Sequence, residues 1–406
     1  MSKHFLTLFS ICALLCYVPT TQAANIYVDA LATGANNGTS WTDAYTSIQP
    51  AVLDANAMPG ADNILVASGY YSNTTPYLFT GPATLSGGQL YGFATTLENI
   101  SGTSPVIEVA ATDLDVSRVD FQNSLSHVVG YSGGMRFKKC HFFGAMNGSV
   151  IGRMCWLIRT DYCRFYNNHS TSGGGAITGQ DCKLVHVERT DFRYNRTTVS
   201  GGAIHVNNPW LAMSGTLGRL KCENSLFRQN GSANYGGAIA MKLAHGKLVN
   251  SVFTRNRARN GGAITAAAAS FSGAHLEVLN CTIFGNSAAV SGGGIQLVDA
   301  GTNIVFTEVF NSILWRNWAL PASVLMKQVN RPPNQFGHCC AAGWGTLPWP
   351  GFANFPTNPQ LLLNGDVMPA SPCVDAGNPV FNTTLFDITM APRIQGPNID
   401  IGAFEQ

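Results

Sequence analysis

The chain has 406 residues, of which only 11% are charged, and its formal net charge at pH 7 is +2. Nucleic-acid-binding proteins usually carry a basic stripe, so this composition argues against nucleic acid as a partner. Beyond residue 23 no segment approaches 18 consecutive apolar residues, so the sequence predicts no transmembrane helix in the mature chain.

Residues 1–23 have the pattern of a secretory signal peptide. Lys3 supplies a positive charge, the apolar run "FLTLFSICALLCYV" follows, and Thr21, Gln22 and Ala23 form a small-x-small cleavage site. We therefore expect an exported protein that is secreted or located at the cell surface.

Residues 24–71 are expected to form an N-terminal cap and the first coil of a stacked structure. "NIYVDA" and "ADNILVASGYY" are predicted strands. The segment between them can form a short amphipathic helix with Ile48, Val52 and Ala55 on one side. A cap is expected here because the first coil of a stacked structure exposes apolar side chains at its open end.

Residues 72–318 contain a repeated phrase that is clear from residue 160 onward. It combines F-x-x-N with GGAI or GGGI, as in "FRYNRTTVSGGAI" from Phe192 to Ile204, and its Phe-type position recurs every 26 to 35 residues. Units of this length cannot bury a core alone and must stack. They lack the 3.6-residue period of helices, and propeller blades are longer. The pattern therefore predicts an all-β solenoid, a parallel β-helix.

Asparagine occupies two columns of the repeat, one three residues after the Phe-type position and one three residues before it. We expect both columns to stack at turns and to link neighbouring coils through amide hydrogen bonds. The paired glycines allow a tight corner and a close approach of neighbouring backbones. The predicted ladder residues are Asn168, Asn195, Asn224, Asn230, Asn250, Asn256, Asn280, Asn286, Asn311 and Asn317.

The longest interval of the repeat contains the interruption "NNPWLAMSG" at residues 207–215. About eight residues must leave the coil there, so the segment is predicted to project as a loop. Trp210 and Met213 on this loop are the candidate ligand-binding residues, since exposed aromatic rings stack on sugars and anchor interfaces. The alternative is that Trp210 packs against its own sheet.

Three stretches carry a resemblance to known families. The opening "IYVDALATGANNGTSWTDAYTSIQPAV" resembles that of secreted right-handed parallel β-helix proteins. "SPCVDAGNP" at 371–379 and "RIQGPNIDIGAFE" at 393–405 resemble the close of the choice-of-anchor Q family of bacterial surface proteins. The GGAI and F-x-x-N repeats are similar to those of chlamydial polymorphic membrane proteins. The resemblance implies an exported, right-handed β-helix.

Residues 319–406 are richer in proline and tryptophan and are expected to form a loop-rich C-terminal cap over the last coil. Arg393 is predicted to be a structural ion-pair hub with Asp375 and Asp400, because a buried charge must be paired. A disulfide between Cys340, or its neighbour Cys339, and Cys373 is expected, since export permits one.

Catalysis is the alternative to binding, because β-helices host lyases that cleave pectin and alginate. Such chemistry needs a base beside a group that neutralises the uronate, and no acidic column is evident across neighbouring coils of the sequence. His205 and Lys242 form the best basic pair and are the candidate catalytic residues, but two solvated side chains on a sheet face are the simpler interpretation. No metal or cofactor is expected. The sequence favours an adhesin-like scaffold that binds a glycan or a cell-surface protein, with a polysaccharide lyase as the alternative.

Overall fold

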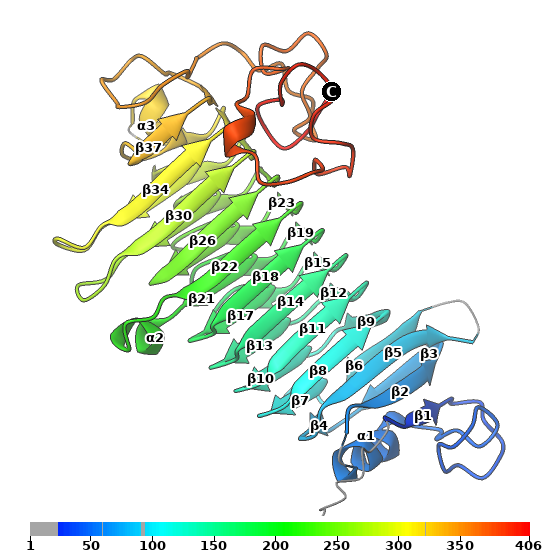
Figure 1. Cartoon of the computed structure of the whole chain (residues 1–406). Coiled ribbons are helices and arrows are strands. Elements are labelled where there is room, and N and C mark those ends of the chain that lie inside the picture. Colours follow the sequence, from blue (N-terminus) through cyan, green and yellow to red (C-terminus); the bar gives the residue numbers. More distant parts are fainter. Residues whose placement is uncertain (1–22, 59, 91–93, 321) are drawn as a thin grey trace, which may run out of the picture.

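The computed structural model describes residues 23–58, 60–90, 94–320 and 322–406. All but the last residue of the predicted signal peptide lie outside this part of the chain. Within it the chain winds as a right-handed parallel β-helix whose coils stack into a long rod (Figure 1). The all-β prediction from the repeats is therefore confirmed.

Four parallel sheets, here called sheets A to D, run along the rod. Sheet A contains β1 (Asn25–Val28), β2 (Asp62–Ala67), β5 (Ala83–Gln89), β8 (Asp113–Ser117), β11 (Gly134–Lys138), β14 (Leu157–Asp161), β18 (Leu184–Glu188), β22 (Gly218–Glu223), β26 (Ala244–Val249), β30 (Ala274–Leu279), β34 (Val305–Phe310) and β37 (Gln335–Gly337). Sheet B contains β3 (Gly69–Asn73), β6 (Thr95–Asn99), β9 (Val119–Gln122), β12 (His141–Phe143), β15 (Arg164–Tyr166), β19 (Asp191–Arg193), β23 (Leu226–Arg228), β27 (Val252–Thr254), β31 (Thr282–Phe284), β35 (Ile313–Trp315) and β38 (Cys340–Ala341).

The other two sheets complete each coil. Sheet C contains β4 (Tyr77–Phe79), β7 (Ile107–Ala110), β10 (Val128–Tyr131), β13 (Val150–Arg153), β17 (Ile177–Gln180), β21 (Ile204–Asn207), β25 (Ile239–Lys242), β29 (Ile264–Ala267) and β33 (Ile295–Val298). Sheet D contains β16 (His169–Ser170), β20 (Arg196–Thr197), β24 (Gly231–Ser232), β28 (Arg257–Asn260), β32 (Ser287–Ser291) and β36 (Trp318–Ala319). The helices are α1 (Ile48–Ala57), α2 (Pro209–Met213), α3 (Val324–Gln328) and a 3-10 turn (Pro379–Phe381).

The aromatic position of the repeat forms the core of the rod. In-register pairing places each phenylalanine directly over the equivalent one in the next coil, and the rings of Phe165, Phe192, Phe227 and Phe253 stack at 4.7 to 5.0 Å. All four side chains are fully buried. Each coil therefore buries its apolar side chain against its neighbours, because it has no core of its own.

The first asparagine column is a continuous buried ladder. Asn168, Asn195, Asn230, Asn256, Asn286 and Asn317 each donate a side-chain hydrogen bond to the next amide oxygen, at 2.8 to 3.0 Å, and Gln328 of α3 closes the series. Each amide also donates to a backbone carbonyl of an adjacent coil, as Asn256 does to Phe227 at 2.9 Å. The ladder satisfies buried polar groups at the corner between sheets B and D.

The second asparagine column has a different role from the ladder that we predicted. Asn224, Asn250, Asn280 and Asn311 all have positive φ values of 45° to 50° at a turn. Only the pair Asn250–Asn224 is linked, at 3.3 Å. The amides of Asn250, Asn280 and Asn311 instead bond to Thr384, Asn382 and Asn378 of the C-terminal segment. This column therefore holds the C-terminal segment against the rod, because its side chains point outward.

The two glycines of each GGAI phrase are needed for different reasons. Gly236 has φ of +63°, which favours glycine. A Cβ on Gly237 would lie 2.1 Å from the carbonyl oxygen of Gly262 in the next coil. The first glycine thus turns the chain, and the second lets two backbones approach closely.

The ends of the rod are covered by different means. At the N-terminal end, α1 buries Ile48, Val52 and Ala55 and contacts β1, β2 and β4 (Figure 1). At the other end, β37 and β38 extend the sheets past residue 318, so the predicted boundary of the β-helix was too early. Residues 378–406 do not close the last coil. They lie against sheet B, where the Ala403 amide donates to the Thr282 hydroxyl at 3.1 Å.

Candidate functional site

The C-terminal segment, residues 378–406, covers only part of the outer face of sheet B, and the rest of this face is open to solvent. That segment packs on the outward residues Leu226 and Val252 of β23 and β27. On β12 and β15 the outward side chains Phe143 and Tyr166 are 40% and 45% exposed, and their rings lie 5.7 Å apart in a nearly parallel arrangement. They line a hollow of about 440 Å³ together with His141, Arg164, Asp191 and Arg193. We call this hollow the aromatic cleft.

A second hollow lies on sheet D, on the other side of the asparagine corner. Its volume is about 690 Å³, and it is lined by His169, Arg196, Arg257 and Arg259 around the small residue Gly231. Register places Arg196 and Arg257 on either side of Gly231, so no side chain at this position separates the two arginines. In the described part of the chain, none of the three guanidinium groups forms an ion pair with a carboxylate. We call this surface the arginine groove.

Sheet A presents a column of charged side chains along its outer face, here called the charged stripe. Parallel register stacks one residue of each strand over the next. The column consists of Asp115, Arg136, Arg159, His186, Lys221, Lys247, Glu277 and Glu308. It is basic in the middle and acidic at both ends. Ion pairs hold it together, for example Lys221 with Glu223 at 2.6 Å and Lys247 with Glu277 at 3.0 Å.

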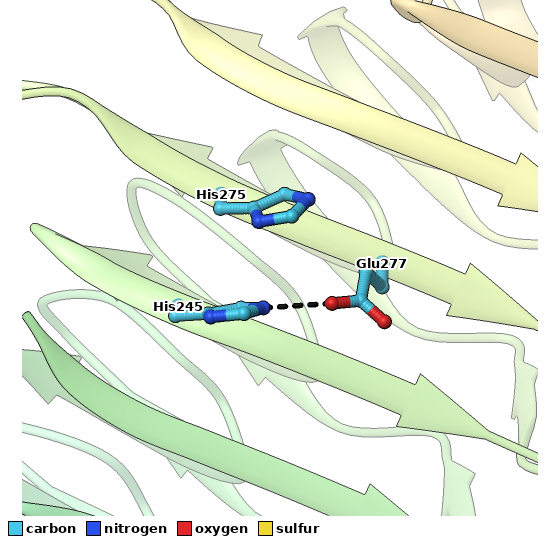
Figure 2. A group of neighbouring side chains, drawn as sticks. All are labelled: His245, His275 and Glu277. Carbon is cyan, nitrogen blue, oxygen red and sulfur yellow. Dashed lines mark hydrogen bonds and ion pairs between the residues drawn. The ribbon is translucent and has the colours of Figure 1, made fainter.

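Two histidines of neighbouring strands lie beside the acidic end of the stripe. The rings of His245 and His275 stack at 4.4 Å, and His245 Nε2 lies 2.8 Å from Glu277 Oε1 (Figure 2). His275 Nε2 lies 3.1 Å from Glu308. Burial opposes the ionisation of Glu277, but hydrogen bonds from His245 and Lys247 outweigh it and hold the pKa of this carboxyl below its ordinary value. Donor atoms of His245, His275 and Glu277 all lie within 4.8 Å of one another, so these residues are able to hold a metal ion.

The charged stripe corrects our sequence analysis, which found no acidic column in neighbouring coils. Glu277 and Glu308 are direct neighbours in register. The residues that follow GGAI, by contrast, lie on sheet C. The missed signal was the second asparagine column, because each of Lys247, Glu277 and Glu308 precedes its asparagine by three residues.

His205 and Lys242 do lie together, on sheet C. They line a pocket of about 220 Å³ with Tyr235 and Met241. Burial, with a smaller contribution from the charge of Lys242, lowers the pKa of His205 to about 4. His205 is therefore neutral at physiological pH. This pair is separate from the charged stripe, which lies on sheet A.

The interruption at 207–215 leaves the coil as the short helix α2. Trp210 is 71% exposed and Met213 is 61% exposed. The carboxylate of Asp181 accepts a hydrogen bond from the Trp210 backbone amide at 2.7 Å and fixes the start of the helix. The structure thus presents this indole to solvent, and its role in binding stays a prediction.

The predicted ion-pair hub at Arg393 is buried, but its partners differ from those we expected. Its guanidinium donates to the backbone carbonyls of Asp400, Gly402 and Phe404 at 2.6 to 3.2 Å. The carboxylate near it is that of Glu405, at 3.8 Å. Asp375 and Asp400 do not pair with it, because their side chains accept hydrogen bonds from backbone amides of this segment.

The predicted disulfide is not formed, and the nine cysteines in the described part of the chain are free thiols. Cys340 and Cys373 are buried in one small apolar cluster, and the thiol of Cys340 donates to the Thr357 carbonyl. The neighbouring thiol of Cys373, and burial, raise the pKa of Cys340 above its ordinary value. Cys339 packs into the main core instead. These cysteines act as small core residues.

Comparisons with known proteins agree with this architecture. Residues 162–180 match the model of the Chlamydia polymorphic membrane protein repeat, and they contain one F-x-x-N and GGGAI phrase. Among curated protein sequences, none matches the chain. The described residues include no helix that is both long and apolar enough to cross a membrane.

Three of the solved structures that resemble this chain are lyases. The pectate lyase Pel9A is 15% identical over 95% of this chain and 97% of its own, with a TM-score of 0.48. A rhamnogalacturonan lyase is 10% identical over 74% of this chain and 85% of its own, with a TM-score of 0.39. The alginate lyase AlyGC is 14% identical over 80% of this chain and 55% of its own, with a TM-score of 0.40.

Proposed function

We propose that this protein is an adhesin-like β-helix, secreted or held at the cell surface, which binds an acidic glycan across the aromatic cleft and the arginine groove. The observation that carries the proposal is the position of these two hollows on either side of the asparagine corner, where they overlap at the coils of β15 and β19. Support for the location comes from the signal-like residues 1–23 and from the repeat shared with a chlamydial membrane protein family.

The chemistry of the two hollows is complementary. Exposed aromatic rings such as Phe143 and Tyr166 stack on the apolar faces of sugar rings. Arginine recognises carboxylate or sulfate through paired hydrogen bonds, and among the described residues no carboxylate forms an ion pair with Arg196 or Arg257. A sugar chain that carries acidic groups would use both surfaces at once, whereas a neutral glycan would use only the rings.

A glycan array with purified protein tests the proposal. We expect acidic glycans to bind to the wild type. Tyr166→Ala should weaken this binding by about 2 kcal/mol, which is about 30-fold. Added salt should also weaken the binding of acidic glycans. Tyr70 is a matched control, because it is 53% exposed on the same sheet but lies outside the cleft. Equal binding by the Tyr166→Ala variant and the wild type, or the absence of acidic glycans among the bound sugars, would refute the proposal.

The second candidate is a lyase, because the charged stripe brings lysines and carboxylates together. Lys221 and Lys247 are its possible bases. Each forms an ion pair with a glutamate, so its amine already has a partner within the stripe. Incubation with acidic polysaccharides, followed by the ultraviolet absorbance of unsaturated products, tests it. Product formation that is lost in the Lys247→Met variant would favour the lyase.

A further inference from the structure

We propose that His245, His275 and Glu277 form a binding site for a transition-metal ion of the zinc type on the outer face of sheet A. The three donor atoms lie within 4.8 Å of one another (Figure 2). The site is independent of the proposed glycan surface, which lies on sheets B and D. The test of the metal site is therefore independent of the test of glycan binding.

The β-helix places these side chains together by register alone. His245 on β26 is paired with His275 on β30, so the two imidazole rings stack at 4.4 Å and point to the same side. Glu277 follows His275 by two residues on the same strand, and alternate residues of a strand face the same way. The three donors come from only two adjacent strands of a rigid sheet.

Small side-chain movements would complete the coordination. Tetrahedral zinc has ligand bonds of about 2.0 to 2.2 Å, so its donors lie about 3.3 Å apart. His245 Nε2 and Glu277 Oε1 are at 2.8 Å and need to separate slightly, while the second imidazole must approach. Both histidine side chains are partly exposed, at 36% and 27%, and have room to rotate. The hydrogen bond between His245 and Glu277 would be replaced by a bond from each to the metal, with the proton of Nε2 lost to solvent and the ring protonated at Nδ1 instead.

The local charges favour a dication. Lys247 binds Oε2 of Glu277, which leaves Oε1 directed at His245. Glu308 contributes a second carboxylate through its contact with His275. With neutral imidazoles, two carboxylates and one ammonium sum to a net charge of −1. Glu308 and Lys247 would orient the ligands, as groups around metal sites usually do.

The donor set selects the kind of metal. Two imidazole nitrogens and one carboxylate suit Zn²⁺ and similar ions, whereas Ca²⁺ and Mg²⁺ prefer oxygen ligands. Three protein ligands leave a fourth position open toward solvent. That position would hold water or a donor group of a bound partner.

Titration calorimetry of the chelator-treated chain with ZnCl₂ tests the site. We expect one equivalent of zinc to bind, CaCl₂ not to bind at this site, and His275→Ala and Glu277→Gln each to lower the zinc affinity at least about 10-fold. The variants keep all cysteines, so a loss of affinity at an unchanged melting temperature is not due to thiols.

His186 of the charged stripe is a matched control. It contacts Glu223 at 3.3 Å, as His245 contacts Glu277. Its neighbours in register are Lys221 and Arg159 and not a second histidine. It therefore has the same ion pairs without a second imidazole. His186→Ala should leave zinc affinity unchanged. The proposal is overturned if the wild type takes up no zinc, if His275→Ala and Glu277→Gln bind like the wild type, or if His186→Ala loses the same affinity.

Discussion

Removing one amide from the middle of the asparagine ladder should destabilise the rod strongly. The Asn256 side chain donates to Asn286 Oδ1 and to the Phe227 carbonyl, both at 2.9 Å. Its oxygen accepts from the backbone amide and the side chain of Asn230, both at 3.0 Å. Asn256→Ala therefore deletes four buried hydrogen bonds and leaves their partners unsatisfied. At about 1 kcal/mol for each bond, the expected loss is about 4 kcal/mol.

The end of the ladder provides a graded comparison. Asn168 donates to Asn195 and to the Phe142 carbonyl but accepts from only one group, the Ala145 amide. Asn168→Ala should therefore cost about 3 kcal/mol, less than the central substitution. Urea unfolding followed by circular dichroism measures both.

Hydrogen exchange gives a local measurement of the same prediction. The backbone amide of Asn230 is bonded to Asn256 Oδ1, so it should lose protection in Asn256→Ala. The amide of Asn195 is bonded to Asn230 instead and serves as the internal reference. A stability within about 1 kcal/mol of the wild type, with the Asn230 amide still protected, would refute the ladder as a source of stability.

Two further predictions concern single rings. Trp210 is 71% exposed on α2, so Trp210→Ala should leave the melting temperature nearly unchanged. If this loop contacts the ligand, the substitution should weaken ligand binding by about 2 kcal/mol. A variant that unfolds at a lower temperature and binds the ligand normally would contradict this prediction. Burial lowers the pKa of His127 to about 3, against a small opposing effect of the backbone at Phe143. Below pH 6.5 the histidine is protonated in the unfolded state before it is protonated in the folded state, so the folding stability falls as the pH falls. The expected loss at pH 4.5 is about 2.7 kcal/mol. A His127→Leu variant should lack this part of the pH dependence in urea unfolding.

The sequence by itself determined the coil and its interior. Stacked parallel strands place equivalent residues of successive coils over one another, so a core position such as Phe192 and a ladder position such as Asn195 must recur along the chain. The recurrence is visible without knowledge of the fold, and it predicted the β-helix and the main ladder correctly. The glycine pairs were visible for the same reason.

Only the tertiary structure decided which outward residues meet. His245 and His275 are 30 residues apart, but Lys221 and Lys247 are 26 apart, because loops of different length leave the coils between strands. Outward positions are free to vary in residue type, so the charged stripe is marked in the sequence only by its fixed distance from the second asparagine column. The C-terminal segment folds back over sheet B through contacts with residues more than 100 positions away, as between Ala403 and Thr282. Such long-range packing sets where the rod is covered and where its faces stay open.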